Sequence, residues 1–283
     1  MRSPVSALIL TLNEEVNLPR CIESLQWVDD IIVLDSGSKD ATVEIAKALG
    51  CRVFHRPFDN WSSHQNWAVK HLPFRHSWVL NIDADEVVTP ELREELSGIA
   101  TCPNPVGFAA FRMRRRDYFH GVWLKHSTFY PTWLVRFYRP EAIRFERLVN
   151  PVTIAEGATG SLQGHIDHQP FSKGIAHWVE RHNSYSTFEA QEYLNRGEWR
   201  WSMISSRDPN VRRRALKSLF SRLPCRPVMK FCYLYLFHLG FLDGLPGFQY
   251  CALQSFYEFM ISLKTRELRR IRNAGVASSV LQG

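Results

Sequence analysis

Residues 78–86 read WVLNIDADE, an apolar run that ends in three carboxylates within four positions. The run Trp78–Ile82 has the length and composition of a buried strand. The carboxylates of Asp83, Asp85 and Glu86 therefore follow the carboxyl end of that strand, and ligands of open α/β sheets bind at this edge. Because Asp83 and Asp85 are two positions apart, an extended backbone points both side chains to one side.

Converging carboxylates repel each other unless a cation lies between them. Oxygen ligands of this kind suit Mg²⁺ or Mn²⁺, which proteins commonly share with the phosphates of a substrate. Asp83 and Asp85 are therefore candidate metal ligands, whereas Glu86 is better placed to orient the turn. The pattern alone is equally typical of a solvated acidic turn before a helix, since the helix dipole favours carboxylates there.

Strand and helix patterns alternate around this stretch. Candidate strands cover Val5–Leu10, Ile31–Leu34 and Arg52–Phe54, each followed by a helical pattern, and a further helix is expected from Pro90 to about Ile99. This alternation with short connections predicts a mostly parallel, doubly wound α/β sheet of the Rossmann type. The sequence contains neither GxGxxG nor GxxxxGK[ST], so it supports neither a dinucleotide-binding fold nor a P-loop.

The pattern changes after residue 105. Three aromatic-rich strand candidates follow without intervening helices: Val106–Arg112, Tyr118–Leu124 and Trp133–Tyr138. They predict an antiparallel extension of the sheet. Residues 145–168 are expected to be irregular, because the glycines there act as turn signals. A long helix is expected over 174–196.

The C-terminal part of the chain combines positive charge with aromatic residues. The formal net charge is +7, and segment 207–230 holds eight Lys or Arg against one Asp, while 264–272 holds five against one Glu. The apolar run Phe231–Leu242 is too short to span a membrane. A basic helix, expected over 211–223, beside an aromatic run is typical of a segment that lies in a membrane interface. A hydrophobic helical pair that covers the sheet or forms a dimer is the alternative.

We therefore expect membrane-surface contact through residues 207–272. Nucleic-acid binding is not expected, because the aromatic residues form one run and do not alternate with basic residues. Six scattered cysteines without a CxxC pair are typical of reduced thiols in a cytoplasmic protein. The chain passes from Met1 into its first strand candidate with no signal-peptide pattern. These features predict a peripheral protein on the inner face of the cytoplasmic membrane.

Two further polar segments accompany the acidic stretch. Thr11–Glu15 (TLNEE) follows the first strand candidate, where Asn13 is a candidate helix cap, and Asp35–Asp40 (DSGSKD) follows the second. Together with Asn81–Glu86, these motifs resemble in order and spacing the family 2 glycosyltransferases of the GT-A fold. The likeness covers about residues 4–200, and it is greatest to bacterial enzymes that build the lipopolysaccharide core.

The resemblance implies a nucleotide-sugar donor. The donor-binding positions that match the motifs are Thr11, Asn13, Glu14, Asp35, Gly37, Gln65 and Asn66. In this scheme Asp35 accepts the uracil N3–H, which favours a UDP-sugar, and Asp83 and Asp85 hold a divalent metal, Mg²⁺ or Mn²⁺, against the diphosphate. The same resemblance makes 1–102 the nucleotide-sugar-binding half of the GT-A domain and 103–200 the acceptor-side half. Residues 201–283 are then a helical, membrane-associated C-terminal region.

An inverting transfer needs a general base that takes the proton of the acceptor hydroxyl. The lipopolysaccharide-core enzymes carry Val-His-Glu where this chain has Val149-Asn150-Pro151, and neither Asn nor Pro can act as a base. Asp117, Glu146 and Glu156 are close in sequence and could supply the base instead, and Asp117 and Glu146 are the favoured candidate bases.

We therefore expect an inverting, metal-dependent glycosyltransferase. It would move a sugar from a nucleotide donor, preferably UDP-linked, to a lipid-linked, lipopolysaccharide or exopolysaccharide glycan acceptor. One alternative is a sugar nucleotidyltransferase, which usually needs a basic Gly-rich loop where Thr11–Glu15 is acidic. Another is a non-catalytic GT-A domain that binds a nucleotide sugar or glycan, suggested by the missing His-Glu pair.

Overall fold

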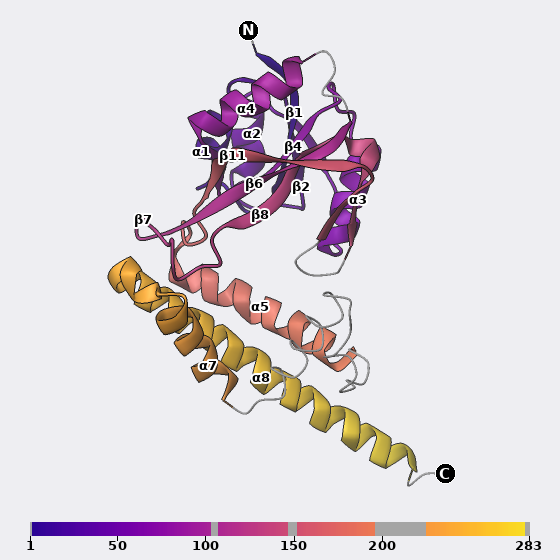
Figure 1. The fold of residues 1–283 in the computed structure, drawn as a ribbon. Coiled ribbons are helices and arrows are strands. Elements are labelled where there is room, and N and C mark those ends of the chain that lie inside the picture. Colours follow the sequence, from indigo (N-terminus) through magenta and orange to yellow (C-terminus); the bar gives the residue numbers. More distant parts are fainter. Residues whose placement is uncertain (1, 103–106, 147–151, 196–224, 281–283) are drawn as a thin grey trace. The chain divides into compact units, whose positions relative to one another are not determined.

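The computed structural model describes residues 2–102, 107–146, 152–195 and 225–280, the last with side chains to residue 274. The chain divides into two compact units, Met1–Lys125 with Phe129–Gly174, and His126–Thr128 with Ile175–Gly283. The first unit contains the sheet and the second is helical (Figure 1). The helix expected over 211–223 and the Asn150-Pro151 pair lie outside the described residues. The assignment of donor, acceptor and membrane roles to 1–102, 103–200 and 201–283 stays a prediction.

Strands and helices alternate through the first part of the sheet unit, as predicted. The elements are β1 (Ser3–Thr11), α1 (Leu18–Glu23), β2 (Val28–Asp35), α2 (Thr42–Ala48), β3 (Arg52–His55), α3 (Trp61–His71), β4 (Val79–Asp83), β5 (Glu86–Val88) and α4 (Pro90–Thr101). The second part is nearly all strand: β6 (Phe108–Phe119), β7 (Val122–Trp123), β8 (Thr132–Tyr138), a short 3₁₀ turn, β9 (Ile143–Glu146), β10 (Val152–Ala155) and β11 (Ala158–His168).

The main sheet has the strand order β3-β2-β1-β4-β8-β6-β11-β5, with β7 paired to β6. The first four of these strands are parallel, whereas β8 runs antiparallel to both β4 and β6. Strands β9 and β10 form a separate antiparallel pair. The predicted mostly parallel sheet with an antiparallel extension is therefore confirmed.

Strand β11 differs from the irregular segment that the sequence predicts over 145–168, because its glycines are not turn residues. At Gly160 a Cβ atom would lie 2.4 Å from the ring of Phe111, and at Gly164 it would lie 2.4 Å from the Cα of Leu92. The glycines therefore allow an extended strand to pass close to its neighbours. Close approach, and not chain reversal, explains both residues.

Helices cover both faces of the parallel part of the sheet (Figure 1). On β1, Ala7 and Ile9 belong to a core cluster with residues of α1, α2 and α4, while Leu8 belongs to a second cluster with Ala68 of α3. Successive strand residues point to opposite faces, so both faces of β1 are apolar. The polar exception inside β1 is buried Ser6, whose Oγ donates to Asp30 Oδ2 at 2.7 Å.

Register brings the three polar motifs to one edge of the sheet. Thr11 pairs with Asp35 across β1 and β2, and Leu10 pairs with Asp83 across β1 and β4. The carboxyl ends of these parallel strands therefore meet, as the motif spacing predicts.

The second unit contains α5 (Gly174–Asn195, from Ile175 on), α7 (Arg226–Cys232), a π-helical turn (Tyr233–Phe237), a 3₁₀ turn (Gly240–Asp243) and α8 (Gly244–Val280). The long helix expected over 174–196 is thus confirmed. Helices α5 and α8 are in contact, since His182 stacks on Trp178 and meets the ring of Tyr257 at 4.9 Å. Among the described helices, none alone is long and apolar enough to cross a membrane. The helix pair Arg226–Phe237 and Gly240–Ala274, which is bent at the break between its two pieces, reaches the length and apolar composition of a membrane span when both pieces are taken together.

Candidate active site

The loops after β1 and β2 are joined by hydrogen bonds. Asn13 has a positive φ of 56°. Its backbone N–H donates to Ser38 Oγ at 2.8 Å, and its Oδ1 accepts from the backbone N–H of Lys39 at 2.8 Å. The backbone N–H of Glu14 donates to Thr42 Oγ1 at 2.7 Å. Asn13 therefore bridges two loops, and the expectation that it caps the next helix is wrong, because α1 begins several residues later.

Asp35 organises the turn that follows β2. Its carboxylate accepts from Thr11 Oγ1 at 3.0 Å, from the backbone N–H groups of Gly37 and Ser38 at 2.9 Å each, and from Ser38 Oγ at 2.5 Å. Burial raises the pKa of Asp35, but these hydrogen bonds outweigh it and hold the pKa below its usual value. Gly37 has a φ of 97°, which favours glycine. The contact of Asp35 with uracil stays a prediction.

The two donor candidates on α3 differ in their surroundings. Asn66 donates through Nδ2 to the carbonyl of Phe145 at 2.8 Å and accepts through Oδ1 from the backbone N–H of Phe145 at 2.8 Å. Its amide is therefore used to hold β9 against α3. Gln65 is buried on the same helix. Donor contact by either residue stays a prediction.

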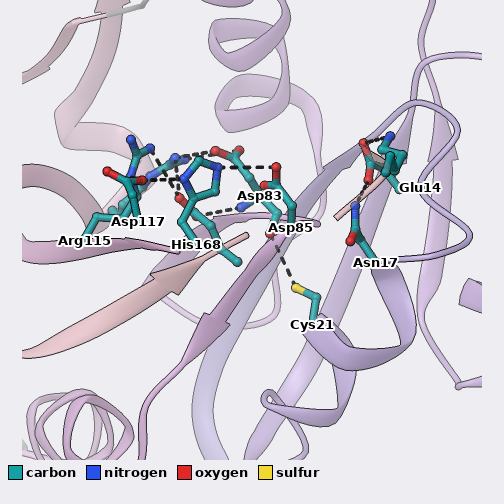
Figure 2. A network of polar contacts seen from close by, with 11 residues as sticks. Glu14, Asn17, Cys21, Asp83, Asp85, Arg115, Asp117 and His168 are labelled. Carbon is teal, nitrogen blue, oxygen red and sulfur yellow. Dashed lines mark hydrogen bonds and ion pairs between the residues drawn. The ribbon is translucent and has the colours of Figure 1, made fainter. Parts of the chain in front are cut away.

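The acidic turn between β4 and β5 lies against arginines (Figure 2). Asp83 forms an ion pair with Arg136 of β8 at 2.5 Å, and its backbone N–H donates to Glu86 Oε2 at 3.0 Å. Glu86 is fully buried and lies 3.4 Å from Arg136 and 3.8 Å from Arg115 of β6. Glu86 thus orients the turn, as expected. Burial raises its pKa, although Arg136 opposes this.

A second group of charges continues from Asp85. His168, the last residue of β11, places Nε2 3.3 Å from Asp85 and Nδ1 2.6 Å from Asp117 (Figure 2). Asp117 also lies 3.0 Å from Nε of Arg115. Burial raises the pKa of Asp117, but Arg115 and His168 outweigh it and lower the pKa. Burial and Arg115 disfavour protonated His168, yet Asp85 and Asp117 raise its pKa to about 9.

The segment after β11 returns to the first loop. Lys173 Nζ donates to the carbonyl of Asn13 at 2.9 Å and to Glu14 Oε1 at 2.6 Å. Glu14 also accepts from Asn17 at 2.7 Å. Burial raises the pKa of Glu14, and Lys173 opposes this. Lys173 and the backbone N–H of Gln169, which donates to the carbonyl of Asp85 at 2.9 Å, connect the segment to two of the three motifs.

The candidate bases lie in different places. Asp117 belongs to the charged group just described, where His168 and Arg115 contact its carboxylate. Glu146 ends β9, is largely exposed and pairs with Arg144 at 3.2 Å. The structure therefore does not bring the two carboxylates into one group of contacts.

The residues fit a divalent cation that is shared with a substrate. Around the acidic turn, four carboxyl groups (Asp83, Asp85, Glu86, Asp117) face three cationic side chains (Arg115, Arg136, His168), so the ionised forms sum to one negative charge, which protonation of Glu86 would remove. Within the described ranges, no three His, Cys, Asp or Glu side chains form a metal-binding group. Mg²⁺ in particular is commonly held by one or two carboxylates and completed by phosphates and water. Asp83 and Asp85 suit that arrangement.

Sequence reasoning missed Arg136, His168 and Lys173 as parts of this edge. Arg136 carried a usable signal, because it interrupts the apolar strand TWLVRFY and a buried arginine needs a carboxylate partner. His168 and Lys173 carried no local signal, since their partners lie more than fifty residues away in sequence.

Comparison with known proteins defines the class. The family model described as "Glycosyl transferase family 2" matches residues 6–164. This match covers more than half of the chain, and it ends inside β11, after all three polar motifs. The fold is accordingly that of a GT-A enzyme with a mostly parallel sheet. The chain belongs to glycosyltransferase family 2 and is a glycosyltransferase.

Two relatives and one solved structure match this chain over most of its length. A protein of Rickettsia typhi, named as an uncharacterized glycosyltransferase, is 27% identical over 93% of this chain and 87% of its own length. The lipopolysaccharide core biosynthesis glycosyltransferase LpsC of Rhizobium meliloti is 26% identical over 92% of this chain and 91% of its own. Residues 1–349 of TarS from S. aureus superpose with a TM-score of 0.44 at 15% identity, covering 94% of this chain and 92% of that one.

Proposed function

We propose that this glycosyltransferase transfers a sugar, with inversion, from a UDP-sugar to a lipid-linked or lipopolysaccharide glycan. The single observation that carries the proposal is the meeting of Thr11, Asp35 and Asp83 at one sheet edge. That edge combines backbone turns suited to a nucleotide with an excess of carboxylates suited to a divalent cation. The relative LpsC, whose name assigns it to lipopolysaccharide core biosynthesis, supports the acceptor class.

Asp83 and Asp85 would hold Mg²⁺ or Mn²⁺ against the donor diphosphate. A bound cation supplies Lewis-acid stabilisation of the negative charge that develops on the nucleoside-diphosphate leaving group. Arg136 and His168 hold the two carboxylates in place through ion pairs. The acceptor hydroxyl forms the new bond to the anomeric carbon while the bond to the diphosphate breaks, and a base takes the hydroxyl proton.

Asp117 and Glu146 are the two bases that we propose to compare. Glu146 is the more accessible, whereas Asp117 is held by His168 and Arg115 and has a lowered pKa. Glu146→Gln lowering turnover with little change in donor affinity would assign the base to Glu146. The same pattern for Asp117→Asn would assign it to Asp117.

The test of the function is UDP release from a panel of UDP-sugars with Mn²⁺ and a lipopolysaccharide extract. We expect Asp83→Asn/Asp85→Asn to lose at least about a thousandfold in turnover, since metal stabilisation is worth several kcal/mol. The exposed Glu94→Gln on α4 removes one carboxylate and serves as the control. Full activity in the double variant would refute the metal role. Calorimetric UDP-sugar binding by the wild-type protein, without turnover on any acceptor extract, would instead favour the non-catalytic binder.

A further inference from the structure

The charged side chains in and near the turn between α7 and α8 are buried or paired. From Phe231 to Leu263 the chain has two charged residues, Asp243 and Glu258. Asp243 is almost fully buried and Glu258 pairs with Arg226, whose side chain is also buried. Over this stretch, therefore, no charged side chain faces solvent, although the segment is on the surface of its unit.

The same turn exposes many large apolar side chains. The exposed ones between the end of α7 and the start of α8 are Tyr233, Leu236, Phe237, Leu239, Phe241, Leu242 and Leu245. Phe237 is 78% exposed and Leu245 is 67% exposed. Sequence neighbours on a helical turn point about 100° apart, so Leu236 and Phe237 expose different sides of it. Leu234 and Gly240 of the same turn are buried, so the exposed apolar side chains leave the turn in several directions away from the rest of its unit.

Internal contacts fix the shape of this turn. Asp243 accepts from the backbone N–H groups of His126 at 2.9 Å and Ser127 at 2.7 Å, and it pairs with His126 Nδ1 at 2.8 Å. A Cβ at Gly240 would lie 2.7 Å from the carbonyl of Leu234, and one at Gly247 would lie 2.3 Å from the carbonyl of Gly240. The backbone is therefore closely packed while the side chains point outward.

The length of the turn suits one leaflet of a bilayer. Arg226–Phe237 and Gly240–Ala274 meet at a bend of 74°. The first piece returns along α8, because Ser255 Oγ donates to the carbonyl of Pro227 at 2.7 Å and Arg226 pairs with Glu258. At about 1.5 Å per helical residue the first piece is about 18 Å long, near half the roughly 30 Å of a hydrocarbon core.

We propose that the segment 231–245, called here the apolar turn, inserts into one leaflet of a bilayer with anionic headgroups. Basic residues bracket it in sequence, with seven Lys or Arg over 207–230 besides the internally paired Arg226 and five over 264–272, which suits anionic headgroups on both sides. A liquid hydrocarbon layer adapts to exposed side chains that leave the turn in several directions. This inference does not depend on the donor chemistry.

The experiment is co-sedimentation of the full-length protein with vesicles of phosphatidylglycerol and phosphatidylethanolamine. Phe237→Glu/Leu245→Glu places charge on the most exposed side chains of the apolar turn. The matched control Leu49→Glu/Val152→Glu alters two exposed apolar residues, at 48% and 43% exposure, outside the apolar turn and its basic flanks. Circular dichroism and UDP-sugar hydrolysis without vesicles check that all three proteins are folded and that the donor site is intact.

We expect the wild-type protein and the control to sediment with vesicles, and the fraction of Phe237→Glu/Leu245→Glu bound to fall at least about tenfold with hydrolysis unchanged. Wild-type protein that stays in the supernatant overturns the proposal. So does equal binding of both double variants. A wild-type dimer that the turn variant converts to a monomer, without any vesicle binding, would assign the surface to self-association and likewise overturn it.

Discussion

His168 Nδ1 lies 2.6 Å from Asp117 Oδ1, so two residues that end or nearly end neighbouring strands share a short charged contact. The other ring nitrogen of His168 faces Asp85. The imidazolium therefore stands between the acidic turn and a carboxylate of β6. This arrangement makes protonation of His168 part of the stability of the edge.

The first prediction is a pH-dependent stability in the absence of metal. The pKa of His168 is raised from 6.5 to about 9. The contribution of His168 to the free energy of unfolding is therefore fully present below pH 6.5 and is lost as the pH rises through 9. The loss is on the order of 3 kcal/mol. Urea unfolding between pH 6 and pH 10 measures it against His168→Gln. Equal losses of stability in both proteins over this range would contradict the prediction.

The second prediction concerns Lys173. Lys173→Ala removes the cation that binds Glu14 and the carbonyl of Asn13, and the pKa of Glu14 should rise further because its burial is then less opposed. We expect the KM for the donor to rise about tenfold, since hydrogen bonds to charged groups are worth about 1.5–3 kcal/mol. Steady-state kinetics measure this, and Lys173→Arg should recover part of the loss. An unchanged KM would show that this contact is only structural.

The third prediction separates the two possible roles of Asn66. Asn66→Ala leaves the N–H and carbonyl of Phe145 without their amide partner, which should cost about 1–3 kcal/mol of unfolding free energy. Because its amide is already used, UDP affinity measured by calorimetry should change little. A large loss of UDP affinity at unchanged stability would restore Asn66 as a donor ligand.

The fourth prediction uses two glycines near α4. Gly164→Ala would place a Cβ 2.4 Å from the Cα of Leu92, so the backbone must shift, at a cost of about 1–3 kcal/mol. Gly98→Ala, within α4, has nothing within 4 Å of its Cβ and should stabilise the helix by about 0.5–1 kcal/mol. Thermal melting of both variants compares the signs. Stabilisation by Gly164→Ala would be incompatible with the close packing of β11.

Local patterns in the sequence are enough to predict the layered sheet and the edge at which the polar motifs meet. Apolar runs of strand length, each followed by a helical period, define the parallel strands, and the residues after Leu10, Leu34 and Ile82 must then share one edge. These are local patterns, and parallel pairing is the arrangement that accommodates them. The family resemblance followed from the same motifs.

The residues that those motifs contact become neighbours through the folding of the whole chain. Asp85 meets His168, and Glu14 meets Lys173, across separations that no local pattern encodes. The role of Gly164 also depends on the folded chain. Its sequence context resembles a turn, but in the structure Leu92 packs against it and leaves no room for a Cβ atom. Ion pairs, burial and close backbone contacts all depend on which strands become neighbours. Neighbouring strands are established by long-range pairing, which is complete only when the whole sheet has formed.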